Sequence, residues 1–220
     1  YDESEIWEPE VKIVNPYGFN GVPDDAIILF DGRDFSKWKS ERNNQEVLWL
    51  LNPDKSMTIK PGTGGIQTIE EHGSIQLHIE WKSPTKIKGD GQYRGNSGIF
   101  FQRRYELQIL DSYENRTYSN GQAGSIYKQH IPLVNVTLPP GKWQKFDIVF
   151  NAPKFDDKGD EIKKGNFTIF HNGVLIHNGI EIISATYDFK KDTPFTLLLQ
   201  DHGRDEGNYI SFRNIWMRKL

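Results

Sequence analysis

Residues 94–115 (RGNSGIFFQRRYELQILDSYEN) hold the side chains of this sequence that are best placed for chemistry. Residues 105–110 alternate apolar and polar types, which predicts a β-strand that presents side chains on two faces. Glu106 and Gln108 then lie on one face, roughly 6.6 Å apart along the strand. A carboxylate and an amide at that spacing can contact one small polar ligand, and a concave sheet face that carries them would suit a sugar.

The simpler interpretation of this pair is a strand whose polar face is exposed to solvent. A second segment argues for a site, because LLLQDHG at residues 197–203 ends an apolar strand with Gln200, Asp201 and His202. Asp201 could orient an imidazole or help to hold a divalent cation, and His202 can act as a base near neutral pH. A polar turn between two strands is the alternative interpretation of these three residues.

Motifs for several other chemistries are missing from the sequence. There is no GxSxG nucleophile elbow, so a Ser-His-Asp triad has no local support. There is no HExxH, P-loop or GxGxxG motif, so zinc peptidase, nucleotide hydrolase and dinucleotide-binding functions have none either. The six histidines are scattered, and His78 and His171 fall in predicted strands, where a structural role is the simpler interpretation.

Composition narrows the class of protein and its partners. The net charge of −3 comes without a basic stripe, which makes nucleic acid an unlikely partner, and no apolar run is long enough for a membrane span. The chain has no cysteine, so disulfides and thiol catalysis are excluded. It begins without the regions of a signal peptide, which fits a cytoplasmic protein or one whose signal was removed. Of the two, we expect a periplasmic or secreted protein.

The rest of the chain reads as many short strands separated by turn residues, with no convincing helix longer than a turn or two. We expect strands at residues 26–30, 35–38, 47–51, 56–60, 65–69, 74–82, 99–102, 105–110, 125–130, 143–150, 167–171, 174–177, 195–200 and 209–219. Residues 95–98 are expected to form a turn, and residues 151–165 a mobile loop. The pattern predicts one all-β domain over residues 1–220, a two-sheet antiparallel sandwich or jelly roll with residues 1–25 as an extended lead.

Segments along the chain resemble the 3-keto-disaccharide hydrolase family, whose fold is the concanavalin A-like lectin/glucanase sandwich. In order they are LFDGRDFSKW (29–38), NSGIFFQ (96–102), YELQILDSY (105–113), GSIYKQ (124–129), GKWQKFDIVF (141–150), HNGVLI (171–176), LLQDHG (198–203) and FRNIWMR (212–218). Each segment is short, but together they keep the family's order. Residues 1–23 have no counterpart, and the link at residues 204–211 is longer than is usual in the family.

The resemblance implies cleavage of glycosides that a partner oxidoreductase has already oxidised at C3. A C3 ketone acidifies the proton on C2, so a base can remove it and the C1 leaving group can depart by elimination, after which water adds back. The route needs a base near C2 and a group that stabilises the enolate oxygen. Glu106 or His202 would suit the base, and Lys128, Arg213 or a bound divalent ion would suit the enolate.

The candidate residues all lie in the segments that carry the resemblance. We take Glu106, His202 and Asp201 as candidate catalytic residues. The candidate substrate-binding residues are Asn96, Gln108, Tyr127, Lys128, Gln200 and Arg213. A divalent metal ion is the one cofactor we consider, and the expected partners are a glycoside or oligosaccharide and the oxidoreductase that supplies it.

Ordinary glycoside hydrolysis by two carboxylates is the poorer match to this sequence. Retaining enzymes place their carboxyl groups about 5 to 5.5 Å apart, and inverting enzymes about 6.5 to 9.5 Å apart. The same-face neighbour of Glu106 is Gln108, and Asp111 lies roughly 16 Å along an unbroken strand and on the opposite face. Asp111 would therefore pair with Glu106 only across a bulge.

Two functions of other classes stay open. A noncatalytic carbohydrate-binding module could stack sugars on some of the six Trp and nine Tyr residues, although core packing explains most of them. Such a module tolerates neutral groups at Glu106 and His202, whereas proton abstraction does not. A structural or protein-docking sandwich would have no concave polar face.

Overall fold

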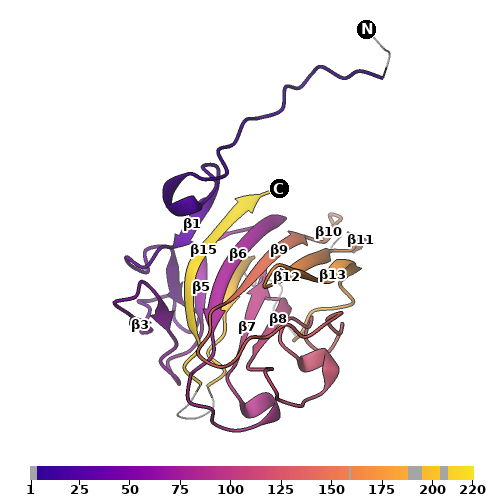
Figure 1. Cartoon of the computed structure of the whole chain (residues 1–220). Helices are drawn as coiled ribbons and strands as arrows, with labels where there is room; N and C mark the ends of the chain where they lie inside the picture. Colours follow the sequence, from indigo (N-terminus) through magenta and orange to yellow (C-terminus); the bar gives the residue numbers. More distant parts are fainter. Residues whose placement is uncertain (1–3, 159, 188–194, 204–207) are drawn as a thin grey trace.

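The computed structural model describes residues 4–158, 160–187, 195–203 and 208–220, and these form a sandwich of two antiparallel sheets (Figure 1). The larger sheet has the order β13 (Val174–Glu181), β12 (Asn166–His171), β9 (Gln144–Asn151), β6 (Ile75–Lys82), β15 (Ser211–Lys219), β4 (Met57–Thr58) and β3 (Leu50–Leu51), and β1 (Ile27–Phe30) also pairs with β15. The smaller sheet has the order β2 (Trp38–Ser40), β5 (Ile66–Glu71), β14 (Thr196–Leu199), β7 (Asn96–Phe101) and β8 (Tyr105–Leu110). The predicted all-β sandwich is confirmed.

Helix is almost absent from the described residues. The 3₁₀ turns η1 (Phe19–Gly21), η2 (Gly91–Tyr93) and η3 (Ser119–Gly121) have three residues each. Among these described elements there is no helix of the length and apolar character needed to cross a membrane.

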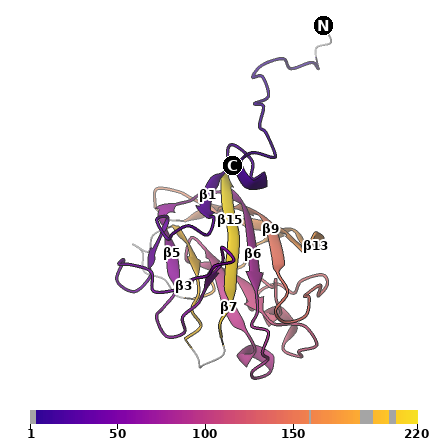
Figure 2. The ribbon, with the colours of Figure 1, turned by 60° about the vertical axis from the view of Figure 1, so that its left-hand side comes forward.

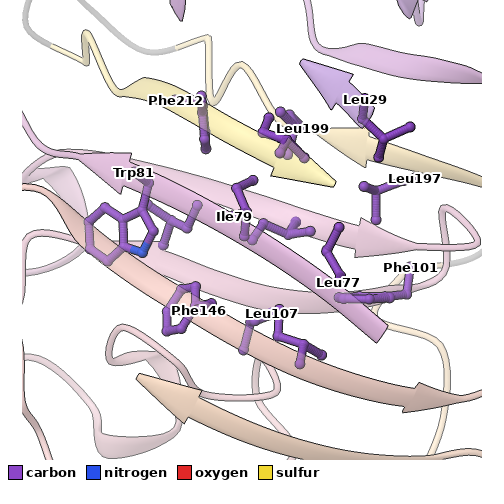
Figure 3. Packing of buried hydrophobic residues seen from close by; sticks show 14 of the residues in the cluster. Leu29, Leu77, Ile79, Trp81, Phe101, Leu107, Phe146, Leu197, Leu199 and Phe212 are labelled. Carbon is purple, nitrogen blue, oxygen red and sulfur yellow. The ribbon is translucent and has the colours of Figure 1, made fainter. Parts of the chain in front are cut away.

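Strand β6 shows how the sequence builds the core. Ile75, Leu77, Ile79 and Trp81 alternate with polar residues, and all four are fully buried between the two sheets (Figure 3). Side chains from both sheets meet there. Phe146 comes from the larger sheet, and the smaller sheet contributes Phe101, Leu107, Leu197 and Leu199. The strand predicted at residues 74–82 is therefore confirmed, and its alternation places the apolar face in the core.

The β7–β8 hairpin differs from the expected arrangement at both ends of β7. β7 begins at Asn96, so the predicted turn at residues 95–98 is wrong, and only Gly95 has the positive φ of a turn residue, at 54°. The chain reverses instead at Gln102 and Arg103, whose φ angles are 52° and 55°. β7 is therefore long enough to pair with all of β8, from Asn96 opposite Leu110 to Phe101 opposite Tyr105.

The predicted strand at residues 125–130 is also wrong. The backbone N–H groups of Gln129 and His130 both donate to the carbonyl of Ile126, which closes a tight turn, and Lys128 has a φ of 58°. Only Ile126 bridges to β8, opposite Leu107. The pattern of side chains in SIYKQH resembles that of a strand, but a residue at positive φ cannot continue one.

The predicted loop at residues 151–165 contains a short hairpin. β10 (Lys154–Phe155) pairs with β11 (Glu161–Lys163), apart from the two main sheets. The strands predicted at residues 167–171 and 174–177 are confirmed as the paired strands β12 and β13, joined at Asn172 and Gly173, whose φ angles of 52° and 82° suit a tight hairpin turn.

Leu77→Ala should destabilise the protein by about 2–5 kcal/mol, because it opens a cavity between the sheets at a fully buried position. The measurement is urea unfolding followed by circular dichroism. Val174→Ala, at a position 43% exposed, is the matched control and should change the free energy of unfolding little. Equal effects of the two substitutions would contradict the assigned core.

Candidate active site

Glu106 and Gln108 lie together on one face of β8, as the alternation predicts. Tyr105, Leu107 and Ile109 belong to the hydrophobic core, so the pair lies on the face of the smaller sheet that is turned away from the core. Both side chains are nevertheless buried, with exposures of 2% and 1%. The half-solvated face that the sequence left open as the simpler interpretation is therefore not what the structure shows.

A glycine makes room for the Glu106 carboxyl group. Gly98 of β7 pairs with Gln108, and Phe100 pairs with Glu106, so both lie on the same face as these residues. A Cβ atom built on Gly98 would lie 2.5 Å from Oε1 of Glu106. Because that distance is too short for any side chain, the carboxyl group occupies the space that the missing Cβ leaves.

A segment of the chain covers this face along the edge of β8. The N–H of Gly124 donates to the carbonyl of Gln108 (2.8 Å), and the N–H of Gln108 donates to the carbonyl of Ser125 (3.0 Å). The N–H of Tyr127 donates to the carbonyl of Glu106 (3.0 Å). We call residues 118–128 the cover segment, and it attaches to the edge of the smaller sheet by these backbone hydrogen bonds.

Three tyrosines surround Glu106. The hydroxyl groups of Tyr118 and Tyr127 lie 2.6 Å apart, and Tyr187 stacks on Phe100 with 6.1 Å between ring centroids. Burial, followed by the charge of Glu106, raises the pKa of Tyr187 to about 12. Burial also raises the pKa of Tyr118, to which its hydrogen bond with Tyr127 adds. Both phenols are therefore neutral at physiological pH and can donate hydrogen bonds.

The electrostatics of Glu106 are those of a buried acid. Burial raises the pKa of its carboxyl group from the ordinary 4.5 to about 8, and the nearby charge of Lys128 opposes the shift. Tuning of a carboxyl group towards neutral pH by burial is common in catalytic acids and bases.

Gln92 organises the amides of the site. Its Nε2 donates to the Thr117 hydroxyl (3.1 Å) and the Gly121 carbonyl (2.8 Å), which leaves its Oε1 as an acceptor. That oxygen accepts from Nε2 of Gln108 (2.9 Å), and Asn96 Nδ2 donates to the Gln92 carbonyl (2.9 Å). Gln92 was not predicted from the sequence. It lies in the turn η2, where no alternation of apolar and polar residues shows which way a side chain points.

Three side-chain oxygens on this face lack a hydrogen-bond partner among the described residues. They are Oε2 of Glu106, Oε1 of Gln108 and Oε1 of Gln200. Gln200 follows β14, and its N–H donates to the carbonyl of Gly98 (2.9 Å) in β7, so Gln200 lies across β7 from Glu106 and Gln108 of β8. The amide oxygens are acceptors only, and a ligand that carries several hydroxyl groups would supply the donors that they lack.

An open cavity of about 550 Å³ lies beside the tyrosines. Its lining residues are Asp90, Gly91, Gln92, Tyr93, Arg116, Tyr127, Tyr187 and His202. The volume falls within the range of small-molecule sites. Of the predicted site residues, Tyr127 and His202 both line this cavity. Asp90, Arg116 and Tyr187 were not predicted from the sequence, because they lie in loops without a periodic pattern.

Lys128 belongs to the same region but is exposed at the end of the cover segment. Its Nζ lies 5.4 Å from the centre of the Tyr127 ring, and its charge acts on Glu106. The direction of the Lys128 side chain is set by the positive φ of this residue, because Lys128 does not lie in a strand.

Two predicted site residues have other roles in the structure. The Asp201 carboxylate accepts from the backbone N–H groups of Gly64 and Gly203, both at 2.9 Å, so it holds a turn together. Arg213 lies in β15 of the larger sheet, where its Nε donates to Glu80 (2.6 Å). Arg213, a candidate substrate-binding residue, therefore does not lie with Glu106, because side chains on the outer faces of the two sheets point in opposite directions.

The groups present give little support for a divalent metal ion. In the part of the chain that the structure describes, no group of three His, Cys, Asp or Glu side chains has an arrangement that could hold a metal ion. The same-face neighbours of Glu106 are amides and an aromatic ring. We therefore derive no step through a metal ion.

The long link at residues 204–211 lies partly outside the described residues, which resume at Asn208.

The fold and this face together describe a β-sandwich with a candidate ligand site of amides, tyrosines and a buried acid. The family model described as a 3-keto-alpha-glucoside-1,2-lyase-like domain matches residues 25–218, and the chain belongs to this family. No curated protein matches the sequence at a significant level.

Solved structures agree with this assignment. A crystal structure from Parabacteroides distasonis, of a protein assigned as a glycosyl hydrolase, is 44% identical, with a TM-score of 0.90 over 99% of this chain and 95% of that chain. Two further structures from this organism, assigned in the same way, show the same fold at 21% and 18% identity. Their TM-scores are 0.64 and 0.57, each over 89% of this chain and over 94% and 99% of theirs.

Glu106→Gln should stabilise the fold at high pH and not at low pH. Below pH 4.5 the carboxyl group is protonated in both states, whereas between pH 4.5 and 8 the unfolded chain releases a proton that the folded protein retains. The wild-type protein therefore loses stability as pH rises through this window, by roughly 5 kcal/mol at about 1.4 kcal/mol per pKa unit.

The check is urea unfolding of both proteins at pH 5 and pH 8.5. Glu71→Gln, which changes an exposed carboxylate at the end of β5, is the matched control and should show no such trend. A constant difference between wild type and Glu106→Gln across this range would contradict the buried acid.

Proposed function

We propose that this protein cleaves glycosides oxidised at C3, by elimination across C1 and C2 followed by hydration. The family to which the chain belongs supports this, since its description names a 3-keto-glucoside 1,2-lyase activity. The observation that carries the proposal is Glu106, a buried carboxyl group without an ion-pair partner among the described residues, whose pKa of about 8 lies near neutral pH.

The chemistry follows from the ketone. A base takes the C2 proton, and the electron pair moves to the C3 oxygen as an enolate. When the enolate collapses, a C1–C2 double bond forms, the C1–O bond breaks and the leaving oxygen takes a proton. Water then adds at C1 and a proton returns to C2, so the sum is hydrolysis with no net oxidation or reduction.

Glu106 is the proposed base. Burial makes its carboxylate a stronger base than an exposed glutamate, and Lys128 keeps part of it ionised at neutral pH. Its side chain is 2% exposed, so contact with C2 requires the tyrosines next to it to shift when substrate enters from the cavity. The unpartnered oxygens of Gln108 and Gln200 would then accept hydrogen bonds from hydroxyl groups of the sugar.

Lys128 and His202 take the other two roles. The Lys128 ammonium group is the cation whose charge acts on Glu106, so it is placed to stabilise the enolate oxygen as charge develops there. His202 lines the cavity and can give a proton to the leaving oxygen at C1.

Direct hydrolysis by two carboxylates fits this face less well. Asp111 is 2% exposed and its Oδ2 accepts from Nε of Arg94 at 2.8 Å, so it is held in an ion pair. The neighbour of Glu106 on its own strand face is the amide Gln108.

The substrate must come from an enzyme that oxidises the C3 hydroxyl group of a glycoside, and we propose such an oxidoreductase as the metabolic partner.

Solvent deuterium provides the first test. In deuterated water the released 3-keto sugar should carry deuterium at C2, as judged by NMR within the first turnovers. The product must also be incubated without enzyme, because ketones exchange their neighbouring protons slowly. Label at C2 no greater than in that control, or cleavage of the unoxidised glycoside at a comparable rate, would overturn the elimination.

Substitutions test the roles of the residues. Glu106→Gln and His202→Ala should each lower kcat by about 10²–10⁴ while the protein stays folded. Glu71→Gln is the control and should keep the activity of the wild type. Binding of a 3-keto-glycoside with no turnover by the wild type would instead favour a noncatalytic carbohydrate-binding module, for which the exposed rings of Tyr93 and Tyr187 offer stacking surfaces.

The pH dependence of kcat/KM provides a further test. If Glu106 is the base, kcat/KM should rise with pH through an inflection near pH 8, where the carboxyl group is half ionised, and level off at higher pH. Lys128→Met removes the charge that lowers this pKa, so the inflection should move to higher pH. Lys142→Met, at an exposed lysine, should leave the profile unchanged. An inflection that stays in place in Lys128→Met would contradict the coupling.

A further inference from the structure

The N-terminal lead carries apolar side chains that its own fold leaves uncovered. Ile6, Val11 and Ile13 are 88%, 91% and 94% exposed. Single exposed apolar residues are ordinary, but three aliphatic side chains this exposed on one short segment mark an interaction site. We call residues 5–14 the arm.

The base of the arm is fixed to the body and its outer part points away. The N–H of Asn15 donates to Asp24 Oδ1 (3.2 Å), the N–H of Asp24 donates to the Asn15 carbonyl (3.1 Å), and Lys12 lies 3.9 Å from Asp25. Beyond these contacts the chain projects from the sandwich in both views (Figures 1 and 2). The arm therefore does not cover the body from which it extends.

The arm has the residues of a β-strand without being in one. Residues 11–14 read VKIV, three of them β-branched and favourable in strands, yet they belong to neither sheet. Val11 and Ile13 lie two residues apart, so an extended chain presents both on one face. Such a segment can add to an open sheet edge.

An open edge of this kind exists at β3. β3 pairs with β4 and, among the described residues, with no strand on its other side. Leu48, Leu50 and Leu51 are 59%, 46% and 45% exposed there. Natural proteins cover or charge an exposed apolar edge, because it otherwise pairs with another chain.

The charges of the two surfaces are complementary. The arm carries Glu8 and Glu10, which are exposed. Next to β3, Lys55 and Lys60 are exposed, while the charge of Asp54 in the same turn is balanced by Lys82, whose Nζ lies 3.9 Å from its Oδ2. An acidic arm is therefore matched to the basic side chains that flank β3.

We propose that the arm of one copy adds as a strand to the β3 edge of a second copy, with Val11 and Ile13 against the leucines, and that a reciprocal contact closes a dimer. Residues 11–14 leave the body directly beyond Asn15, so the second copy lies against this end of the sandwich, and the outer residues 5–10 extend roughly 20 Å further across it at about 3.3 Å per residue. Each copy contributes one arm and one receiving edge, so the contact is made twice in the dimer.

The relative of known structure carries a corresponding segment. The match to the 44% identical crystal structure covers 99% of this chain, which includes the arm.

Because the chain has no cysteine, cross-linking can test the pairing directly. Ile13→Cys and Leu50→Cys proteins are mixed and treated with a short bis-maleimide. The expected product has twice the chain mass of 25.5 kDa and forms in higher yield than from either variant alone. Ile162→Cys, at a position 66% exposed in β11, replaces Leu50→Cys in the control mixture and should give none.

The double variant Ile13→Cys/Leu50→Cys distinguishes an arm that binds a second copy from an arm that binds the β3 edge of its own chain. A cross-link within one chain, which leaves the mass unchanged, would overturn the proposal, as would equal yields with the Ile162→Cys control. Sedimentation provides the second readout. The wild type should be a dimer at micromolar concentration, Ile13→Lys and Leu50→Lys should be folded monomers, and Ile162→Lys should stay a dimer. A monomeric wild type, or a dimer that survives both substitutions, would also overturn it.

Discussion

Burial of the Glu106 carboxyl group is the constraint on which the site depends. An acid can be held under a protein surface only if the fold keeps it neutral or supplies a counter-charge. Here the pKa rises to about 8, Lys128 lies close enough to oppose the shift, and Gly98 leaves the space that the carboxyl group fills. The position of the β7–β8 hairpin, the missing side chain at Gly98 and the cover segment all serve this one group.

The amides beside Glu106 are fixed by a different means. Gln92 uses its donor nitrogen on Thr117 and Gly121, so its oxygen is committed to Gln108. Gln108 then has its own oxygen left over as an acceptor. A ligand therefore meets hydrogen-bonding groups whose orientation is set in advance, which lowers the cost of ordering them on binding.

The parts of this structure that the sequence predicts are those that depend on local alternation. Strand β6 and the shared face of Glu106 and Gln108 follow directly from side chains that change face at each residue. The burial of Glu106 does not follow, because its cover comes from Tyr118, Tyr127 and Tyr187, which lie outside the strand. Lys128 was placed in a strand because a positive φ at lysine leaves no mark in the sequence. Arg213 was misplaced because alternation gives the face within one sheet and not the sheet to which a strand belongs.

The cover segment also closes the edge of β8, and this links the site to solubility. Its backbone hydrogen bonds to Glu106 and Gln108 occupy groups that an open edge strand would present to other molecules. Any change that loosens the cover segment to admit a bulkier substrate also uncovers a strand edge. Enlarging this cavity by mutation should therefore select for compensating charged residues beside β8, since a roomier site without them would aggregate.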